Sequence, residues 1–559
     1  MKKYRNDICV SFYYNLYEYI LAKNRKRWYD EHEGGYCFQG KAGKALTEGS
    51  KRNVWIGVDV GTTGVRAIAY RSDGTKLASA EAFYPLSTPH PDWAEEDPRE
   101  VVRATESVIR ETGEALSASG IMPQGIALST IMHTFMPLDK ACQPLAPMMT
   151  WADSRSSGIV QELKADAGFA KALYGRTGCP VHACYPFPKI LWLKRHQEVL
   201  FHKMGRIGSI KDYLFFELTG EWLIDHSTAS TSGMYCEKQM DWDEEAIAYL
   251  GIGKDMLPRP VSTTHGEPLC VAAASRLNLP AGLPVVIGAT DGVLVNVGIG
   301  AIRKGQLSAT IGTSGAIRML TEKPTVDERM RTWCYNLVDD IWVSGGAINN
   351  GGMILRWVRD EILGYTPEDM KRLGVDAYDL MTMQASHSPA GAGGLLLLPC
   401  FTGERAPYWN SDLRGLFFGL SLSTKRADMI RATLEGICFS LKAVYEALLD
   451  FSRAEDIRVS GSFTKSPLWM QILANILEHE ITLPDNSEGA AYGAAVLGFI
   501  SMGELSSIAD TADLVHPKKI FYPQEDTQQT YRELYRIFEH VYWNLQKEFA
   551  EIAAFQSRA

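Results

Sequence analysis

A strand, a Gly-Thr-Thr/Ser-Gly turn and a second strand occur twice in this sequence, about 250 residues apart. The first copy occupies residues 54–70 and turns at Gly61-Thr62-Thr63-Gly64. The second occupies residues 306–320 and turns at Gly312-Thr313-Ser314-Gly315. Apolar, β-rich runs flank both turns, as expected for strands. The repetition predicts an internal duplication in which two similar halves face one another across a cleft.

The rest of the chain alternates strand and helix patterns, which is typical of an α/β protein. Residues 282–288 and 457–459 have the composition of strands, whereas residues 428–447, 466–478 and 490–502 are predicted helices. A chain of 559 residues is also too long for a single hydrophobic core. We therefore predict two α/β domains that flank a cleft and meet near residue 300.

The overall charge and the cysteines exclude several classes of protein. A net charge of −9 argues against a nucleic-acid-binding protein, which needs a basic surface. The ten cysteines are scattered and show no CxxC pair or Cys/His spacing of a zinc site. They indicate reduced thiols in a cytoplasmic protein. A small anionic substrate is still allowed, because local basic groups decide its binding.

Residues 1–53 precede the regular pattern and form an N-terminal extension of unknown role. Their apolar run, residues 8–22, is interrupted by Asn15, Tyr17 and Glu18. A signal peptide needs an uninterrupted apolar stretch and a small-residue cleavage site, and this run is too short and polar to span a bilayer. We expect a helical appendage or an over-extended translation start here, and no membrane association.

The two turns contain the residue types that a phosphate site needs. Backbone N–H groups reach phosphate oxygens only where no side chain blocks them, which favours glycine, and hydroxyl groups add further donors. Gly61, Thr62 and Thr63 meet this need on one side of the cleft, and Gly312 and Thr313 meet it on the other. The chain has neither a GxxxxGK[ST] loop nor the protein-kinase His-Arg-Asp set, so those two phosphoryl-transfer designs are absent.

Two aspartates stand near these turns in the predicted fold. Asp59 lies at the end of the first strand, where it could hold Mg²⁺ through water against bound phosphates. Asp291 follows a strand and precedes a helix rich in small residues, so its carboxylate could take the proton of an attacking hydroxyl. On local sequence alone, a turn-forming role for Asp59 and a helix N-cap for Asp291 are equally acceptable.

Several longer segments resemble the FGGY family of carbohydrate kinases. Residues 415–420 and 428–435, Gly-Leu-Phe-Phe-Gly-Leu and Asp-Met-Ile-Arg-Ala-Thr-Leu-Glu, are similar to the C-terminal signature of the family. Residues 186–196 resemble its N-terminal signature, with a departure at Cys184. The order of the aspartates and glycine turns also follows the family, and the resemblance covers roughly residues 54–525.

This resemblance implies ATP and Mg²⁺ as cofactors and two actin/hexokinase-type (ribonuclease H-like) domains that close on their ligands. Residues 54–300 would form the N-terminal domain, which binds sugar and phosphate, and residues 301–525 the C-terminal domain, which binds nucleotide. Residues 526–559 would add a helical C-terminal segment.

The resemblance also assigns roles to individual residues. Asp291 matches the catalytic aspartate of the family, and Gly312 and Thr313 match its second phosphate turn. Gly461 matches the adenosine loop, although Ser462 and Phe463 replace glycines that many members have there. The local nucleotide contacts are therefore in doubt beyond Gly461.

Three segments of the first domain supply side chains suited to a sugar, whose hydroxyls need short polar partners and an indole over an apolar face. These candidates are Met132 and His133, then Trp151, Asp153 and Arg155, and finally His182. Singly, each has a simpler structural interpretation, such as a hydrogen-bonded core histidine or an N-capped helix start with an ion pair.

Together, these segments resemble the gluconate kinase branch of the family, as do residues 209–230, 345–352 and 403–409. The branch implies ATP-dependent phosphorylation of D-gluconate to 6-phospho-D-gluconate, with Asp291 as the base. We expect Arg155 to meet the carboxylate of the sugar acid, because an anionic substrate favours a forked cationic partner.

Two other functions compete with this interpretation. The chain could phosphorylate another sugar or polyol, such as xylulose, because substrate choice changes easily within one fold. It could instead be an inactive nucleotide-binding sensor, which the changed adenosine loop favours and the intact Asp59, Asp291 and both turns oppose. The sequence leaves open whether the chain assembles as a homodimer.

Overall fold

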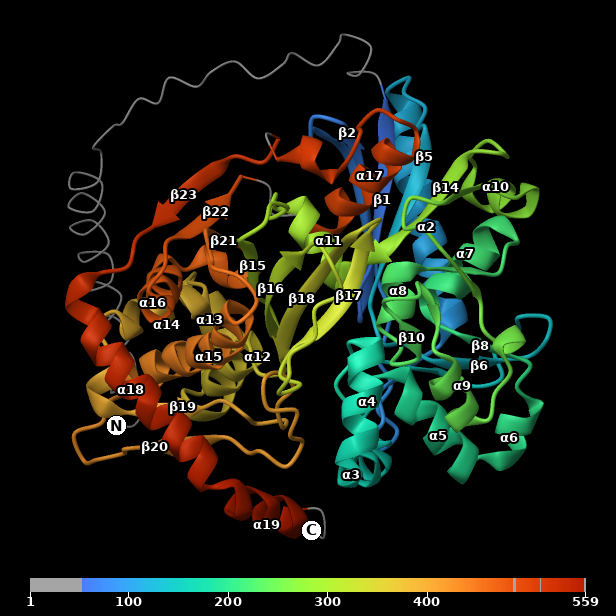
Figure 1. The fold of residues 1–559 in the computed structure, drawn as a ribbon. Helices are drawn as coiled ribbons and strands as arrows, with labels where there is room; N and C mark the ends of the chain where they lie inside the picture. Colours follow the sequence, from blue (N-terminus) through green and yellow to red (C-terminus); the bar gives the residue numbers. More distant parts are fainter. Residues whose placement is uncertain (1–52, 486–488, 513, 557–559) are drawn as a thin grey trace.

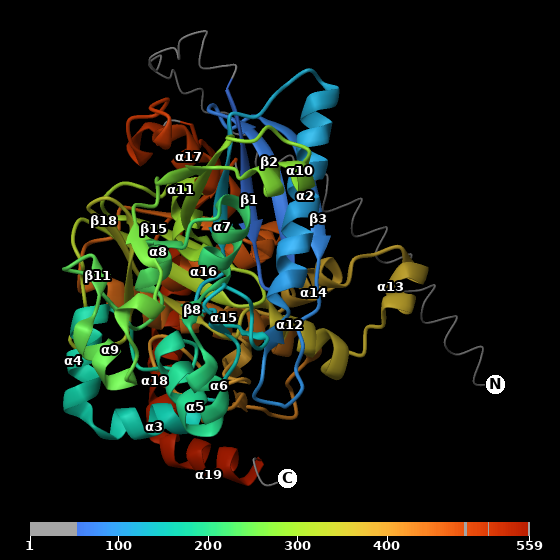
Figure 2. The same cartoon turned by 90° about the vertical axis from the view of Figure 1, so that its right-hand side faces the viewer.

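The computed structural model describes residues 53–485, 489–512 and 514–556 (Figure 1). The predictions for residues 1–52 lie outside the described residues. Two mixed β-sheets form the frame of the molecule, with helices packed on their faces (Figures 1 and 2).

The first sheet is built from the residues of the first predicted domain. Strand β1 pairs antiparallel with β2, which pairs antiparallel with β3, and β5 and β14 continue the sheet in parallel on the other side of β1. A short strand, β13, closes that edge. In spatial order the strands are β13 (Gly266–Pro268), β14 (Pro284–Thr290), β5 (Gly125–Thr130), β1 (Val54–Val60), β2 (Gly64–Arg71) and β3 (Lys76–Phe83).

The second sheet repeats this pattern. Three strands, β15, β16 and β18, are antiparallel neighbours, and β21 and β22 add in parallel beyond β15. Strands β17 and β23 extend the two edges. In spatial order the strands are β17 (Trp333–Val338), β18 (Ile341–Ile348), β16 (Gly315–Thr321), β15 (Gln306–Ile311), β21 (Asp456–Ser460), β22 (Ile481–Pro484) and β23 (Pro517–Phe521).

In both sheets, three antiparallel strands are therefore followed by two parallel ones, and the Gly-Thr-Thr/Ser-Gly turn joins the first two strands. The shared order and direction confirm the α/β fold with two similar, ribonuclease H-like halves. Parallel strands need crossover connections, which the covering helices provide. The principal ones are α2 (Pro98–Ala118) and α7 (Ile210–Thr219) in the first half, and α15 (Arg426–Leu449) and α16 (Pro467–Leu477) in the second.

Helix α17 (Gly489–Ser501) comes late in the chain yet packs against the first sheet, beside α11 (Asp291–Gly298) (Figure 1). The contact is close because Gly57 on β1 carries no side chain: a Cβ there would stand 2.0 Å from the carbonyl oxygen of Ala491. Trp55 of the same strand packs edge-on against Phe499 of α17, with ring centroids 6.5 Å apart. The two halves thus share one packed layer.

Gly57→Ala tests this layer. The added methyl group meets backbone rather than a movable side chain, so we expect the free energy of unfolding to fall by about 3 kcal/mol or more, measured by urea denaturation. Gly175→Ala is the matched control, because Gly175 lies within helix α4 (Ala167–Thr177) and a Cβ there meets nothing within 4 Å. That variant should gain about 0.5–1 kcal/mol. Equal stability of the two variants would contradict the close packing of α17.

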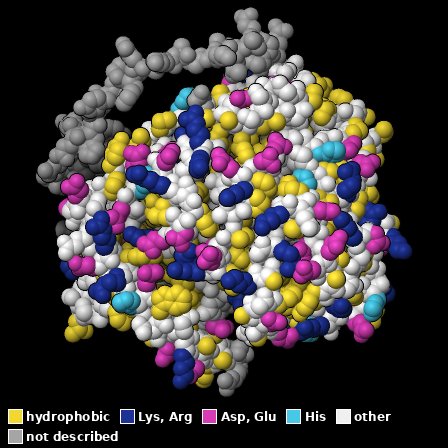
Figure 3. All heavy atoms as spheres, viewed as in Figure 1, with side chains coloured by type: hydrophobic (Ala, Val, Ile, Leu, Met, Phe, Trp, Pro, Cys, Tyr) yellow, Lys and Arg dark blue, Asp and Glu magenta, His cyan; other side chains and the backbone are white. Residues whose placement is uncertain are grey.

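The chain ends in two helices, α18 (Glu525–Asn544) and α19 (Gln546–Gln556), within the predicted C-terminal helical segment. No described helix is long and apolar enough to cross a membrane. On the face shown in Figure 3, basic and acidic side chains are interspersed, without the extended basic surface that nucleic-acid binding needs.

Candidate active site

A cavity of about 280 Å³ lies between the two halves of the molecule. It brings together predicted site residues from both halves, which are Thr62, Met132, His133, Trp151, Asp291, Gly312 and Thr313. The lining residues that the sequence analysis did not predict as site residues include Cys184, Tyr185, Arg318, Trp333, Arg405 and Trp409. The other predicted ligand-binding residues Asp59, Gly61, Thr63 and Gly461 are not among its lining residues.

Both Gly-Thr turns are tight and closed by backbone hydrogen bonds. The N–H of Gly61 donates to the carbonyl of Gly64 at 2.9 Å, and the N–H of Gly312 donates to the carbonyl of Ser314 at 2.8 Å. A Cβ on Gly312 would meet nothing within 4 Å, so this turn presents open backbone. Such turns fit the phosphates of ATP, because anions bind where backbone N–H groups are unobstructed.

Gly461 follows β21, next to the strand that leads into the second turn. Its φ is 100°, and a Cβ there would stand 2.5 Å from the carbonyl oxygen of Ile311. Phe463, two residues on, is buried and packs against Trp469 at 5.8 Å between ring centroids. Phe463 is therefore a core residue here, and Gly461 is required by both the backbone angle and the space.

Asp59 and Asp291 lie at the carboxyl ends of β1 and β14, which flank β5 in the first sheet. The hydroxyl of Ser129 on β5 donates to Asp59 at 2.9 Å. Asp291 starts helix α11 and accepts a hydrogen bond from the N–H of Gly292 at 2.6 Å. Burial, and then the like charge of Asp59, raise the pKa of Asp291 to about 7. A carboxylate with this pKa is suited to accept a proton near neutral pH.

The residues fit Mg²⁺ held mainly by water and phosphate. Among the described residues, no group of three or more His, Cys, Asp or Glu side chains could hold a metal ion. Mg²⁺ in phosphoryl-transfer sites usually takes only one or two carboxylates and keeps several waters. Two carboxylates that repel each other beside the phosphate turns, Asp59 and Asp291, match that donor set.

His133 enters the cavity from a strained loop, with a φ of 65°. Its Nδ1 lies 2.9 Å from the carbonyl oxygen of Thr231, which can only accept, so Nδ1 carries the proton. Burial lowers the pKa of His133 to about 3. The ring is therefore neutral and leaves Nε2 as a hydrogen-bond acceptor, which suits a sugar hydroxyl.

Trp151 connects the sugar side of the cavity to the first phosphate turn. Its indole Nε1 donates to the hydroxyl of Thr62 at 2.9 Å. The guanidinium carbon of Arg405, from the second half, lies 4.9 Å above the indole ring. One aromatic side chain thus contacts groups from both halves of the cavity.

Asp153 and Arg155 do not line the cavity, which disagrees with the role expected for Arg155. The Arg155 side chain is only 2% exposed and pairs with Asp153 and with Glu95, both at 2.6 Å. Its guanidinium also stacks on Trp93 at 3.6 Å. A buried arginine with two carboxylates and an indole has no free face for a substrate. These residues instead hold the loop that carries Trp151.

His182 is buried beside the cavity but does not line it. Its Nδ1 accepts a hydrogen bond from the N–H of Cys184 at 3.2 Å, and its ring packs edge-on against Trp409 at 5.4 Å. Burial and neighbouring cations lower its pKa well below the usual value. The simpler interpretation, a hydrogen-bonded core histidine, describes this residue.

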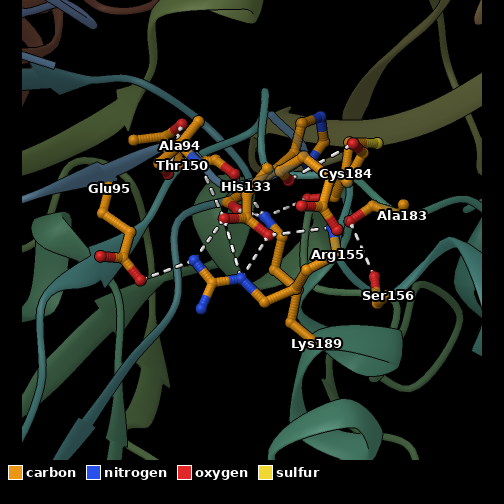
Figure 4. A network of polar contacts seen from close by, with 12 residues as sticks. Ala94, Glu95, His133, Thr150, Arg155, Ser156, Ala183, Cys184 and Lys189 are labelled. Atoms are coloured by element: carbon orange, nitrogen blue, oxygen red, sulfur yellow. Dashed lines mark hydrogen bonds and ion pairs between the residues drawn. The ribbon is translucent and has the colours of Figure 1, made fainter. Parts of the chain in front are cut away.

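Two buried lysines, absent from the sequence-based site, organise its backbone. Lys189 donates to the carbonyls of His133, Thr150 and Cys184 at 2.9, 2.6 and 2.7 Å (Figure 4). Each of these carbonyls belongs to or directly precedes a cavity-lining residue. Lys211 donates to the carbonyls of Leu128, Ile287 and Ala289, which lie on the two strands beside Asp291. In the sequence, each of these two lysines stands within an otherwise apolar helical pattern, and this pattern could have identified them.

Arg318 and Arg405 are further lining residues that the sequence analysis missed. Arg318 is the one charged residue of strand β16, Gly-Ala-Ile-Arg-Met-Leu-Thr, and it shares a face with Ala316. A charge inside an apolar strand was the signal that could have identified it. Arg405 lies in a loop, and only the fold brings it to the cavity.

Comparisons with known proteins match both halves of the chain to one family. The N-terminal domain of the FGGY family of carbohydrate kinases matches residues 54–298, and the C-terminal domain of that family matches residues 307–502. The gluconokinase of Bacillus subtilis (strain 168) is 38% identical over 508 residues, which are 90% of this chain and 98% of that protein.

Two solved structures share the fold over nearly the whole described chain. Gluconate kinase from Lactobacillus acidophilus has a TM-score of 0.83 and 29% identity, covering 89% of this chain and 99% of that one. Xylulose kinase from the same species has a TM-score of 0.83 and 30% identity, covering 89% and 100%. The fold alone therefore does not separate these two substrates.

The chain belongs to the FGGY family of carbohydrate kinases. It is a carbohydrate kinase, an enzyme that transfers a phosphoryl group to an alcohol, and the family implies ATP as the donor. The predicted family and two-domain fold are confirmed by these matches. The roles of individual site residues remain predictions.

Proposed function

We propose that this kinase transfers the γ-phosphoryl group of ATP to the C6 hydroxyl of D-gluconate, giving 6-phospho-D-gluconate and ADP. The observation that carries the proposal is a single cavity that joins Asp291, both phosphate turns and two buried arginines. A sugar acid supplies the hydroxyl from which Asp291 takes a proton, and it supplies the negative charge that the arginines favour. The 38% identity to a gluconokinase supports the same substrate.

The residues divide the chemistry between them. Asp291 accepts the proton of the C6 hydroxyl as its oxygen bonds to the γ-phosphorus and the bond to the ADP oxygen breaks. Thr62 and Thr313 supply donors to the phosphates from the two halves, and Gly61 and Gly312 keep the backbone of the two turns open. Mg²⁺, when bound near Asp59, neutralises phosphate charge. Catalysis of this kind is mostly positioning and electrostatic stabilisation.

The sugar hydroxyls have partners in the same cavity. Neutral His133 offers Nε2 as an acceptor, and Trp151 offers an indole face. Met132 packs beside Gly292, directly after Asp291: a Cβ on Gly292 would stand 2.3 Å from its Cε. We assign these three side chains to binding of the acceptor.

We also propose that the enzyme is cytoplasmic. The described cysteines are free thiols, which fits a reducing compartment.

A coupled assay of ADP release tests the proposal, with ATP·Mg²⁺ against gluconate, gulonate, xylulose, ribulose and glycerol. We expect gluconate to give the highest kcat/KM by at least about tenfold, since a buried polar group discriminates strongly against substrates that leave it unpaired. A higher value for xylulose or glycerol would overturn the substrate. ATP binding without turnover of any acceptor would favour the sensor function.

A further inference from the structure

Buried arginines in this protein fall into two groups. Four are buried among the described residues, namely Arg155, Arg318, Arg405 and Arg431. Arg155 pairs with Asp153 at 2.6 Å, and Arg431 pairs with Glu435 at 2.7 Å. Within the described part of the chain, neither of the other two has an ion pair, and the Nε of each lacks a hydrogen-bond partner. Both of these unpaired arginines line the cavity.

An unpaired buried cation is costly, because burial removes water and no carboxylate replaces it. Burial accordingly lowers the pKa of Arg318 to about 10. Two such groups in one cavity indicate two anionic partners that arrive with the ligands. A kinase with a neutral acceptor brings one anion, the transferring phosphoryl group, whereas a kinase with a sugar acid brings two.

Arg405 is connected to the phosphate turns and also lies close to residues assigned to the acceptor, because it stacks over Trp151 and, after burial, its charge contributes to the low pKa of His133. It donates to the carbonyl of Ile348 at 3.3 Å, and Ile348 is paired with Gly315 of the second turn. Its guanidinium also stacks over Trp151, whose Nε1 is bonded to Thr62 of the first turn. Arg405 is thus connected to both phosphate turns.

Arg318 lies on strand β16 and also lines the cavity. It is three residues beyond Gly315 on β16, so its Cα is about 10 Å along the strand from that turn. In register it faces Gly345 on β18, which pairs in turn with Trp333 on β17. Because Gly345 has no side chain, the Trp333 ring occupies the space above it: a Cβ on Gly345 would stand 2.9 Å from that ring. Arg318 and Trp333 therefore lie on the same sheet face, on either side of this glycine.

Arg318 lies between residues assigned to the acceptor and the strand that leads into the second phosphate turn. A Cβ on Gly292 would stand 3.9 Å from its Nε, beside Met132 and directly after Asp291. Its one hydrogen bond among the described residues goes to the hydroxyl of Thr310, at a long 3.3 Å. The guanidinium therefore keeps most of its donors for a ligand.

We propose that Arg318 binds the carboxylate of the acceptor and so selects sugar acids over neutral sugars. This inference rests on the proposed function, because it names the residue that recognises the acid end of the same substrate. It also replaces Arg155, whose charge is already paired.

Arg318→Gln tests the inference, because glutamine keeps a hydrogen-bonding side chain and removes the charge. Binding is followed by the fluorescence of the cavity tryptophans Trp151, Trp333 and Trp409, with gluconate and with D-glucitol, a neutral hexitol of the same chain length. We expect the Kd for gluconate to rise at least about 30-fold, with the Kd for glucitol and the KM for ATP unchanged. Arg318→Lys should recover part of the affinity for gluconate, because it restores the charge without the fork.

Arg405→Gln is the matched variant. We expect this variant to lower kcat and to weaken the binding of ATP. The ratio of the affinities for gluconate and glucitol should not change. Thermal melting adds a second readout: the ligand-free Arg318→Gln protein should melt no lower than the wild type, because an uncompensated charge is removed.

Three results would overturn the role of Arg318. One is equal loss of gluconate and glucitol binding, and another is a fall in kcat with unchanged gluconate affinity, which would place Arg318 on the phosphoryl group. The third is an acid-selective loss in Arg405→Gln instead. If the wild-type enzyme prefers another sugar acid, gluconate is rejected as the substrate. The role of Arg318 is then tested with the same variants and that acid. If the wild type prefers a neutral acceptor, both proposals fail.

Discussion

Asp291→Asn should reduce kcat for phosphoryl transfer by about 10³- to 10⁴-fold while leaving the KM for ATP nearly unchanged. The carboxylate lies at the carboxyl edge of the first sheet and starts helix α11 in the cavity, where it can take the hydroxyl proton. Asparagine has a similar shape but no basic oxygen. The measurement is steady-state kinetics at saturating acceptor, and a variant with more than a tenth of the wild-type kcat would exclude Asp291 as the base.

The same residue predicts a pH profile. Burial and the charge of Asp59 raise the pKa of Asp291 to about 7, so the base is protonated and inactive below that pH. We expect kcat/KM to rise as the pH increases from 5.5 towards 8 with an apparent pKa near 7, and the residual rate of Asp291→Asn to lack this step. The folded protein holds this proton more tightly than the unfolded chain does. The free energy of unfolding therefore falls as the pH rises to about 7, where Asp291 of the folded protein ionises. The variant should therefore melt at an equal or higher temperature at pH 8.

Lys189→Met should destabilise the first half of the molecule by about 3 kcal/mol, because it removes a donor to the carbonyl of Thr150 and the only donor described for the carbonyls of His133 and Cys184. A buried acceptor left without a donor is costly even when the substituted side chain has a similar volume. These carbonyls belong to the segments that carry the acceptor-binding side chains. We therefore also expect the KM for the acceptor to rise at least about tenfold, with a smaller change for ATP.

The two effects are measured by urea denaturation and by steady-state kinetics. Lys171→Met is the control, because Lys171 is an exposed residue of helix α4 and its loss should change stability by no more than about 0.5 kcal/mol. An unchanged KM for the acceptor in a destabilised Lys189→Met protein would mean that Lys189 supports the fold without positioning the site.

Much of this site follows from rules that connect adjacent residues. The two turns were predicted because glycine and hydroxyl groups between strands suit a phosphate site, and the family resemblance selected a catalytic role for Asp291 over a helix N-cap. The edge of a parallel sheet collects such ends in one place, so residues far apart in sequence converge there. The duplicated sheet order follows from the repeated strand–turn–strand unit for the same reason.

The rest depends on contacts that no local pattern contains. Arg155 was expected to meet the substrate because an anionic sugar acid favours a forked cationic partner, but Glu95 and Trp93, some sixty positions earlier, contact it instead. Arg318 reaches the cavity through the register of β16 with β18, and Arg405 through a loop. Whether a charged side chain is paired or free is decided by these distant partners.

The position of α17 has a consequence for how this chain is made. Strand β1 emerges from the ribosome early, yet the helix that covers Gly57 and Trp55 ends at Ser501. The apolar surface of the first sheet must therefore wait for almost the whole polypeptide before it is covered. Contacts between such distant segments slow folding and leave intermediates exposed to aggregation. The first half is thus the earliest part to be synthesised and among the last to be completed.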